Sequence, residues 1–186
     1  VLMDLSHRGK LRLSGSDAAK FLQGMLSNLV EELSPGEGVY NTFLTRRGKF
    51  VADMHLYRRE NDFAADLPPG LASVFAEAID MYIIMDQVEV EEVTESLCGL
   101  GLFGPASARC LKEAGLGAEG LAEHGHRDVE GVHIARELWT GEDGYLLWAP
   151  PERAEALWTD FSNGGARPAG TTAFGTMTLE AGTRLF

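Results

Sequence analysis

Cysteines and basic side chains are scarce in this chain of 186 residues. The two cysteines, Cys98 and Cys110, are too few for a fold held together by disulfides, and their spacing is not that of metal ligands. Only 16 Lys and Arg stand against 28 Asp and Glu, which gives a formal net charge of −12. Because binding to a phosphate backbone needs a basic surface, we expect no nucleic-acid partner.

Long apolar runs are also missing. The longest candidate, Met81–Met85, falls far short of the roughly 18 apolar residues that a membrane span needs. The first ten residues, VLMDLSHRGK, contain too few apolar side chains for a signal peptide. With 45% hydrophobic and 24% charged residues, the composition is that of a soluble globular protein. We therefore expect a cytoplasmic protein of one or two domains with no membrane partner.

Short strand patterns alternate with short helix patterns along the chain. Strands are predicted at 10–14, 39–44, 49–57, 63–67, 87–94, 97–103, 132–139 and 145–149. Helices are predicted after Ser16, after Pro68-Pro69, over 104–115, after Pro150-Pro151 and over 171–181, with 115–130 as a loop. Ser16 is expected to cap the first helix and Gly182 to follow the last. Hairpins interleaved with helices predict an α+β fold with mostly antiparallel sheets.

The first predicted hairpin contains a lone carboxylate. If residues 45–48 form the turn, Tyr40 lies directly opposite Asp53, and the alternation of the strand puts Asp53 on one face with His55 and Tyr57. A half-buried carboxylate beside a tyrosine suits a site that handles a proton or orients an amine. Alternatively, this face is solvated and Asp53 is an ordinary surface acid. The sequence leaves both interpretations open.

The turn of the second hairpin places Glu142 and Asp143 between two glycines. A carboxylate held in a rigid turn can accept two parallel N–H bonds from the edge of an aminopyrimidine ring. Trp139, next to this turn, can stack on a planar ligand. The alternative is that these acids simply suit a turn and that the tryptophan is a core residue. Both possibilities stay open here.

A metal site is not predicted. His124 and His126 form a His-x-His pair near Glu123, but no third convergent ligand can be named from the sequence. The two cysteines are best explained as small packing residues. We therefore expect no metal among the site residues.

Several motifs occur together in a fixed order. They are Asp4–Lys10 (DLSHRGK), Pro35–Tyr40 (PGEGVY), Arg47–Asp53 (RGKFVAD), Thr140–Tyr145 (TGEDGY) and Leu179–Gly182 (LEAG). With these motifs the chain resembles the aminomethyltransferase family, which comprises the glycine-cleavage T-protein and its folate-binding relatives. One branch of these relatives assists iron–sulfur cluster assembly. The resemblance extends over nearly the whole chain.

The resemblance implies a fold and a chemistry. The fold would be two intertwined α+β subdomains over residues 1–186, with boundaries near residues 46 and 135, and without the C-terminal β-barrel of the family. Tetrahydrofolate would bind in a central channel, where Asp53 would be the catalytic residue that orients the attacking folate amine. The methylene carbon would arrive on the lipoyl arm of the carrier H-protein. Tyr40, Trp139 and Glu142 would bind the folate, with Glu142 at the pterin edge.

Two positions depart from the family pattern. T-proteins usually carry arginines where this chain has Phe174 and Thr178. Two functions therefore remain open: a transferase that moves a methylene group to tetrahydrofolate, and a non-catalytic folate-binding accessory protein for iron–sulfur cluster assembly or repair. A third possibility is a scaffold that binds neither folate nor a carrier.

Overall fold

The computed structural model describes residues 1–183, and these divide into two compact units. Unit 1 combines Val1–His7 with the chain from Ser96 onward, and unit 2 is the continuous segment Arg8–Glu95. The division falls at positions other than the boundaries near 46 and 135 that the family resemblance implies. It does so because the first strand pairs with a strand that begins at Cys98, which joins the N-terminus to the second half of the chain.

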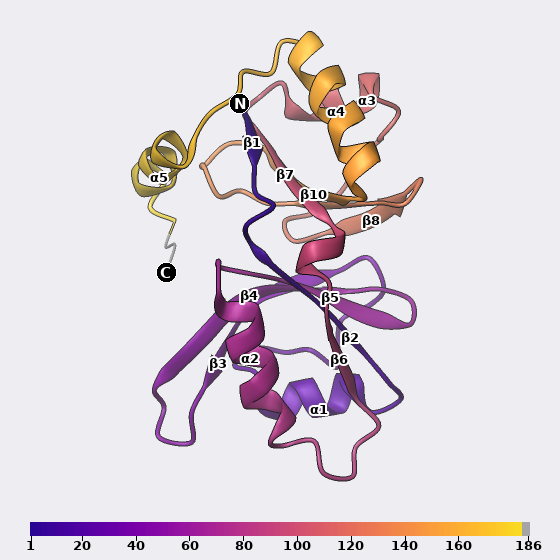
Figure 1. Cartoon of the computed structure of the whole chain (residues 1–186), viewed down its shortest axis with the longest axis vertical. Coiled ribbons are helices and arrows are strands. Elements are labelled where there is room, and N and C mark those ends of the chain that lie inside the picture. Colours follow the sequence, from indigo (N-terminus) through magenta and orange to yellow (C-terminus); the bar gives the residue numbers. More distant parts are fainter. Residues whose placement is uncertain (184–186) are drawn as a thin grey trace. The chain divides into compact units, whose positions relative to one another are not determined.

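Unit 2 is a five-stranded sheet with two helices, drawn from indigo to magenta in Figure 1. In the order β3-β4-β5-β2-β6, its strands are Gly38–Leu44, Phe50–Arg58, Asp62–Leu67, Gly9–Ser14 and Glu89–Glu92. The helices are α1 (Ala18–Met25) and α2 (Leu71–Asp80). Every pair of neighbouring strands is antiparallel.

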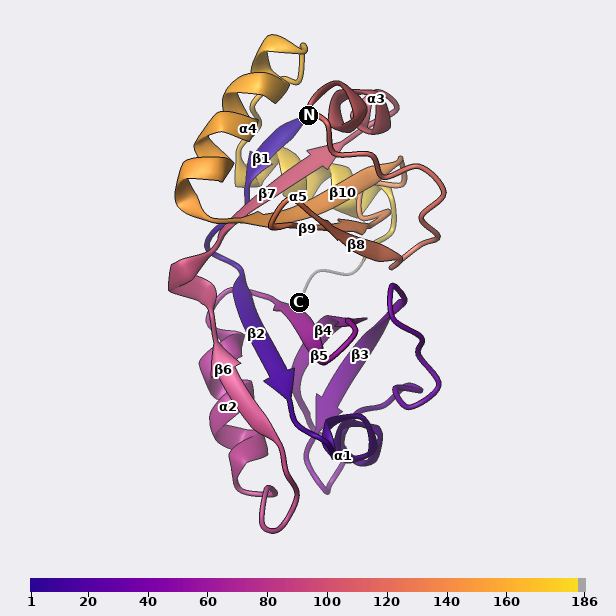
Figure 2. The ribbon, with the colours of Figure 1, turned by 90° about the vertical axis from the view of Figure 1, so that its right-hand side faces the viewer.

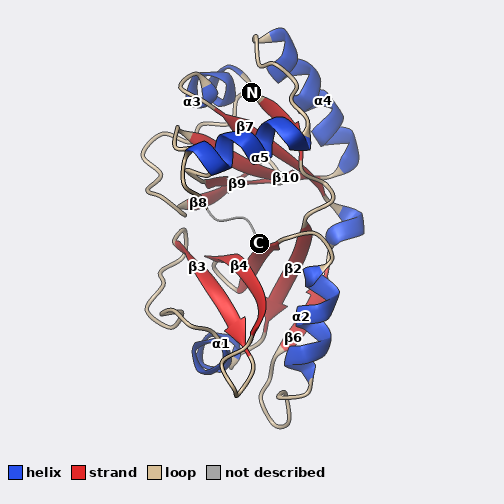
Figure 3. Ribbon diagram, turned by 90° about the vertical axis from the view of Figure 1, so that its left-hand side faces the viewer, coloured by secondary structure: helices blue, strands red, loops and turns tan. Residues whose placement is uncertain are grey.

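The two faces of this sheet differ in polarity. One face contributes Leu11, Met54 and Ala65 to a buried apolar core that is completed by Phe21 of α1 and Phe75 of α2. Figure 3 shows both helices beside this sheet. The opposite face carries a row of polar and charged side chains. Burial of apolar side chains on the helix-covered face is the main stabilising term for this unit.

Unit 1 contains the second five-stranded sheet, drawn with its helices in Figure 2. In the order β1-β7-β10-β9-β8, its strands are Leu2–Asp4, Cys98–Phe103, Gly144–Ala149, Val132–Arg136 and His126–Val129. Its helices are α3 (Ser107–Glu113), α4 (Pro151–Asn163) and α5 (Thr171–Glu180), and the short 3-10 helix η1 spans Thr94–Ser96 at the junction with unit 2. Leu111 of α3 and Leu157 of α4 are buried with Leu100 and Leu147 of the sheet.

The start of helix α1 differs from the prediction. The helix begins at Ala18, and neither Ser16 nor Asp17 caps it with a side-chain hydrogen bond. Both side chains bind Gln87 instead: the Ser16 hydroxyl contacts Gln87 Oε1 at 3.0 Å, and the Gln87 N–H donates to Asp17 Oδ2 at 2.8 Å. A contact distant in sequence has therefore replaced the local cap.

The predicted loop over 115–130 is partly wrong, because it contains strand β8. This strand pairs with β9 through a two-residue turn at Glu130 and Gly131, whose φ angles of 50° and 77° are both positive. Such angles characterise the tight hairpin turns that favour glycine. The strand itself, His-Arg-Asp-Val, has no apolar alternation that could have indicated it.

The α+β class with mostly antiparallel sheets is confirmed. Gly182 also follows helix α5 as expected, in the left-handed region at φ 73°. Within residues 1–183, no helix is long and apolar enough to cross a membrane.

Candidate functional site

The first hairpin, β3–β4, has a different register from the predicted one. Tyr40 lies opposite His55, and Asp53 lies opposite Thr42. The pairing is displaced by two residues for two reasons. Thr45 pairs with Lys49 at the turn, where the Thr45 N–H donates to the Lys49 carbonyl oxygen at 2.8 Å, and a bulge between Phe43 and Leu44 adds one more residue to β4. The prediction that placed Tyr40 directly opposite Asp53 is therefore wrong in register, although both side chains lie on the same face of the sheet.

Tyr40 and Asp53 nevertheless meet across the diagonal of this hairpin. The Tyr40 hydroxyl donates to Asp53 Oδ2 at 2.9 Å. Asp53 is only 5% exposed, so the interpretation of Asp53 as an ordinary solvated acid does not hold. Its other oxygen, Oδ1, is buried and has no hydrogen-bond partner among the described residues. A buried carboxylate oxygen without a partner is costly and is characteristic of a site that receives a ligand donor.

Asp53 flanks a polar row that crosses unit 2 from strand to strand. Tyr40 pairs with His55, His55 with Asp66, and Asp66 with Lys10, so that four neighbouring strands each contribute one side chain. The Tyr40 and His55 rings lie 5.2 Å apart between centroids. Lys10 is fully buried and donates to the Arg8 carbonyl oxygen at 3.0 Å. The sequence analysis did not identify this row, since it depends on the register of four strands.

Arg8 forms a buried ion pair with Asp66 on this face. Its Nε and Nη2 atoms lie 2.8 Å and 2.5 Å from Asp66 Oδ2, and both side chains are buried. Burial disfavours the charged guanidinium, but the charge and hydrogen bonds of Asp66 outweigh it and raise the pKa of Arg8 above its ordinary value. Asp53 adds a smaller contribution in the same direction. The positive charge of Arg8 therefore acts on both carboxylates.

Glu142 lies in unit 1, in the turn between β9 and β10. It is exposed, and its carboxylate makes no hydrogen bond or ion pair with any of the described residues. The turn borders a pocket of about 500 Å³. The lining combines acidic and apolar groups, among them Glu142, Glu180, Phe103, Pro105 and Met177. Such a lining suits a flat group that presents N–H donors.

Trp139 is buried among other aromatic rings of unit 1. Its ring lies 6.0 Å from Phe103 and 6.0 Å from Phe174 between centroids. Phe174, at one of the two positions where the family resemblance implies an arginine, is thus an aromatic packing residue. Thr178, at the other position, is 1% exposed and donates to the Gly175 carbonyl oxygen. Neither position supplies a cation.

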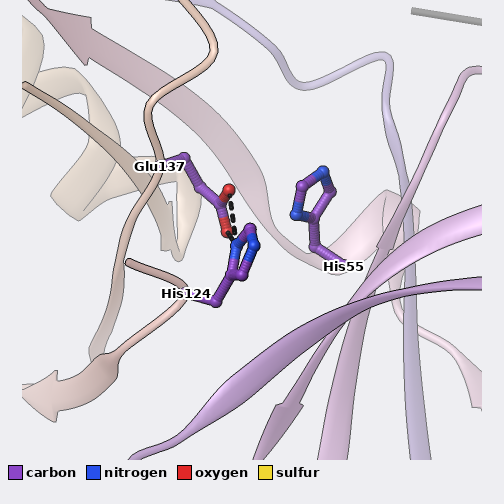
Figure 4. Close-up of side chains that lie close together, drawn as sticks. All are labelled: His55, His124 and Glu137. Atoms are coloured by element: carbon purple, nitrogen blue, oxygen red, sulfur yellow. Dashed lines mark hydrogen bonds and ion pairs between the residues drawn. The ribbon is translucent and has the colours of Figure 1, made fainter. Parts of the chain in front are cut away.

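The two histidines of the His-x-His pair have separate partners. Nδ1 of His124 lies 3.1 Å from both carboxylate oxygens of the buried Glu137, as Figure 4 shows. His126 lies on β8, with its ring 4.9 Å from that of His133. Burial lowers the pKa of His124, but the hydrogen bond and charge of Glu137 outweigh this effect, so that the pKa is raised. Glu137 was not anticipated as a partner, because a glutamate beside a turn is common in any sequence.

The whole chain matches one protein family. Residues 1–186 match the family model described as the GCVT N-terminal domain, and the chain belongs to this family. The family is that of the T-protein and its relatives, as the motifs from Asp4 to Gly182 indicated.

Individual relatives are similar over the entire chain. The aminomethyltransferase of Rubrobacter xylanophilus is 34% identical over 195 residues, which cover 100% of this chain and 51% of that protein. An aminomethyltransferase of Thermus thermophilus is 33% identical, with coverage of 100% and 55%. A crystal structure of glycine cleavage system aminomethyltransferase T from Bartonella henselae matches with a TM-score of 0.92 at 27% identity, covering 99% of this chain and 51% of that chain. The chain thus spans about half the length of the curated relatives it matches.

Proposed function

We propose that this chain is the tetrahydrofolate-binding portion of a T-protein-like aminomethyltransferase. In this function, a methylene group passes from an aminomethyl-lipoyl carrier, the H-protein, to tetrahydrofolate. Asp53 orients the folate amine that attacks the methylene carbon. Tyr40 lines the folate site, and Glu142 holds the pterin edge. Trp139 contributes from behind, since its buried ring stacks on Phe103, which borders the pocket beside Glu142. The names of the relatives and the match to the T-protein structure support this class of reaction.

The geometry of Asp53 carries the proposal. Its Oδ2 atom accepts the Tyr40 hydroxyl at 2.9 Å, which fixes the plane of the carboxylate. The buried Oδ1 atom has no hydrogen-bond partner among the described residues, so its acceptor capacity is unused and suits a folate N–H. A carboxylate oriented in this way positions an amine for attack and can accept its proton.

The exposed Glu142 carboxylate is also suited to binding tetrahydrofolate. An aminopyrimidine edge presents adjacent N–H donors, and a carboxylate accepts two of them in parallel. The pocket beside Glu142 adds the apolar surfaces of Phe103, Pro105 and Met177, against which a planar ring can pack.

A second candidate function is folate binding without transfer, in an accessory protein for iron–sulfur cluster assembly or repair. The observation that favours it is that Phe174 and Thr178, at the two positions where the resemblance implies arginines, supply no cation. Phe174 packs against Phe103 at a centroid distance of 5.5 Å, and Thr178 is buried. Without these cations the chain has a weaker hold on an anionic folate and on the charge that changes during transfer.

Calorimetric titration with tetrahydrofolate tests the binding part of the proposal. We expect the protein to bind, and Glu142→Gln to weaken binding by about tenfold or more, since charge-assisted bidentate hydrogen bonds are worth more than about 1.4 kcal/mol. Glu130→Gln is the matched control, because Glu130 is an exposed glutamate in the other hairpin turn of this sheet. Absence of tetrahydrofolate binding would contradict both candidate functions.

Folate-dependent ammonia release from an aminomethylated H-protein separates the two candidates. A transferase releases ammonia, and Asp53→Asn should reduce the rate strongly while folate still binds. A protein that binds tetrahydrofolate but releases no ammonia is an accessory protein. Full activity of Asp53→Asn would refute the role of Asp53.

A further inference from the structure

The turn that carries Glu142 is held by hydrogen bonds to the two residues that follow Glu142, Asp143 and Gly144. We call Thr140–Gly144 the Glu142 turn. The Arg136 guanidinium contacts Asp143 Oδ1 through Nη2 at 2.5 Å and Nε at 3.2 Å. This hydrogen bond, together with the charge of Asp143, raises the pKa of Arg136. The Glu137 N–H donates to the Gly144 carbonyl oxygen at 2.9 Å and closes the hairpin.

A second set of contacts reaches the same turn from the segment between β7 and α3. The carbonyl oxygen of Asp143 accepts the Gly104 N–H at 2.7 Å and the Ser107 hydroxyl at 3.2 Å. Ser107 is 3% exposed, so its hydroxyl has little competition from water. Gly104 can make its contact because it lies at φ 114°, a conformation that residues with a side chain rarely adopt. The peptide between Asp143 and Gly144, one residue beyond Glu142, is thus anchored from a different part of unit 1.

Glu142 itself contrasts with these anchors. Its side chain is exposed, and within residues 1–183 nothing hydrogen-bonds to its carboxylate. A backbone fixed by neighbours with a carboxylate that remains available is a preorganised acceptor, which loses little conformational entropy when a ligand binds.

We propose that Ser107 and Arg136 are positioning residues for ligand binding, which act through Asp143 to hold Glu142 in its binding orientation. This inference rests on the proposed function, since it assumes that Glu142 contacts the folate. Neither residue touches the ligand itself. Ser107 acts on the main chain of the turn, and Arg136 acts on the Asp143 side chain, so the two provide independent routes to the same effect.

A double-mutant cycle tests the inference in the full chain, with calorimetric titration of tetrahydrofolate as the readout. We expect Ser107→Ala to raise the dissociation constant about three- to tenfold, the range for loss of one buried hydrogen bond. When Glu142→Gln is already present, Ser107→Ala should raise the dissociation constant less than twofold, because there is no longer a carboxylate to position. Arg136→Gln should likewise raise the dissociation constant when Glu142 is present and change it little in the Glu142→Gln variant.

Several outcomes distinguish a positioning role from a structural one. Thr159→Ala is the control: it removes a hydroxyl-to-carbonyl hydrogen bond of 3.1 Å within α4 and should leave the dissociation constant unchanged. If Ser107→Ala and Arg136→Gln each weaken binding equally with and without Glu142, the two residues only stabilise the fold and the inference is wrong. If Glu142→Gln alone has no effect, the proposed contact of Glu142 fails, and the positioning role fails with it.

Discussion

The buried ion pair between Arg8 and Asp66 is the most consequential residue-scale feature of unit 2. Both Arg8 donors converge on Asp66 Oδ2, while Oδ1 has no hydrogen-bond partner among the described residues. Removing one partner of such a pair leaves the other charge buried and uncompensated, which costs more than the pair itself contributes. The neighbouring Arg12–Asp62 pair joins β2 to β5, the strand that also carries Asp66, and its Arg12 side chain is 52% exposed.

Arg8→Met should therefore lower the free energy of unfolding by about 3–5 kcal/mol. Arg12→Met, the matched control on strand β2, should lower it by about 1 kcal/mol or less, because exposed ion pairs are screened by water. Urea unfolding followed by circular dichroism measures both. Equal losses for the two variants would show that burial of Arg8 does not govern the stability of this face.

At the scale of elements, strand β7 depends on glycine to accept its neighbour. The Leu5 N–H donates to the Gly99 carbonyl oxygen at 2.8 Å, beside the pairing of β1 with β7. A Cβ atom at Gly99 would lie 2.7 Å from the Leu5 carbonyl oxygen, a contact with backbone that cannot rotate away. In contrast, a Cβ at Gly24 in helix α1 would meet nothing within 4 Å.

We expect Gly99→Ala to destabilise the protein by about 1–3 kcal/mol, as overpacking of a closely packed position does. Gly24→Ala should instead stabilise it by about 0.5–1 kcal/mol, since alanine loses less backbone entropy in a helix interior. Thermal unfolding measures both effects: Tm should fall for Gly99→Ala and rise for Gly24→Ala. A Gly99→Ala variant as stable as the unmodified protein would mean that β1 can move away from β7 at little cost.

At the scale of the whole chain, the two units differ in how they are assembled from the sequence. Unit 2 is one continuous segment with its own sheet, two helices and a buried apolar core. Unit 1 needs the first seven residues as well as the segment that begins at Ser96. Leu2 of β1 is fully buried in the core of that unit, so the N-terminus is part of its stability.

The isolated segment 8–95 should therefore fold by itself, since a continuous chain of this size can bury a sufficient core. The isolated segment 96–186 should be clearly less stable, because β7 loses its β1 partner and the core loses Leu2. Urea titration of each segment, followed by tryptophan fluorescence for 96–186 and by circular dichroism for both, makes the comparison. If segment 96–186 unfolds cooperatively and is as stable alone as it is in the full chain, residues 1–7 are not needed for its stability and the expectation is wrong.

Local patterns in the sequence determined the elements and the main candidates of the site. Period-two alternation gave strands such as β3 and β4, apolar spacing gave α2 and α4, and the turn residues placed Glu142 in a hairpin. These signals involve residues close together in the chain, which is why they can be interpreted without the fold. The same patterns were weak for β8, whose four residues lack apolar alternation.

The tertiary structure alone decided the register of β3 and β4, the burial of Asp53 and the partners of the charged residues. The pairing at the turn and a bulge between Phe43 and Leu44 each displaced the register by one residue, and the turn residues in the sequence indicate neither. Arg8 and Asp66 are 58 positions apart, and Ser107 and Asp143 are 36 apart. Such contacts form because helices and strands pack to bury apolar surface. This packing determines which polar side chains become neighbours, and buried polar groups then form hydrogen bonds with those neighbours.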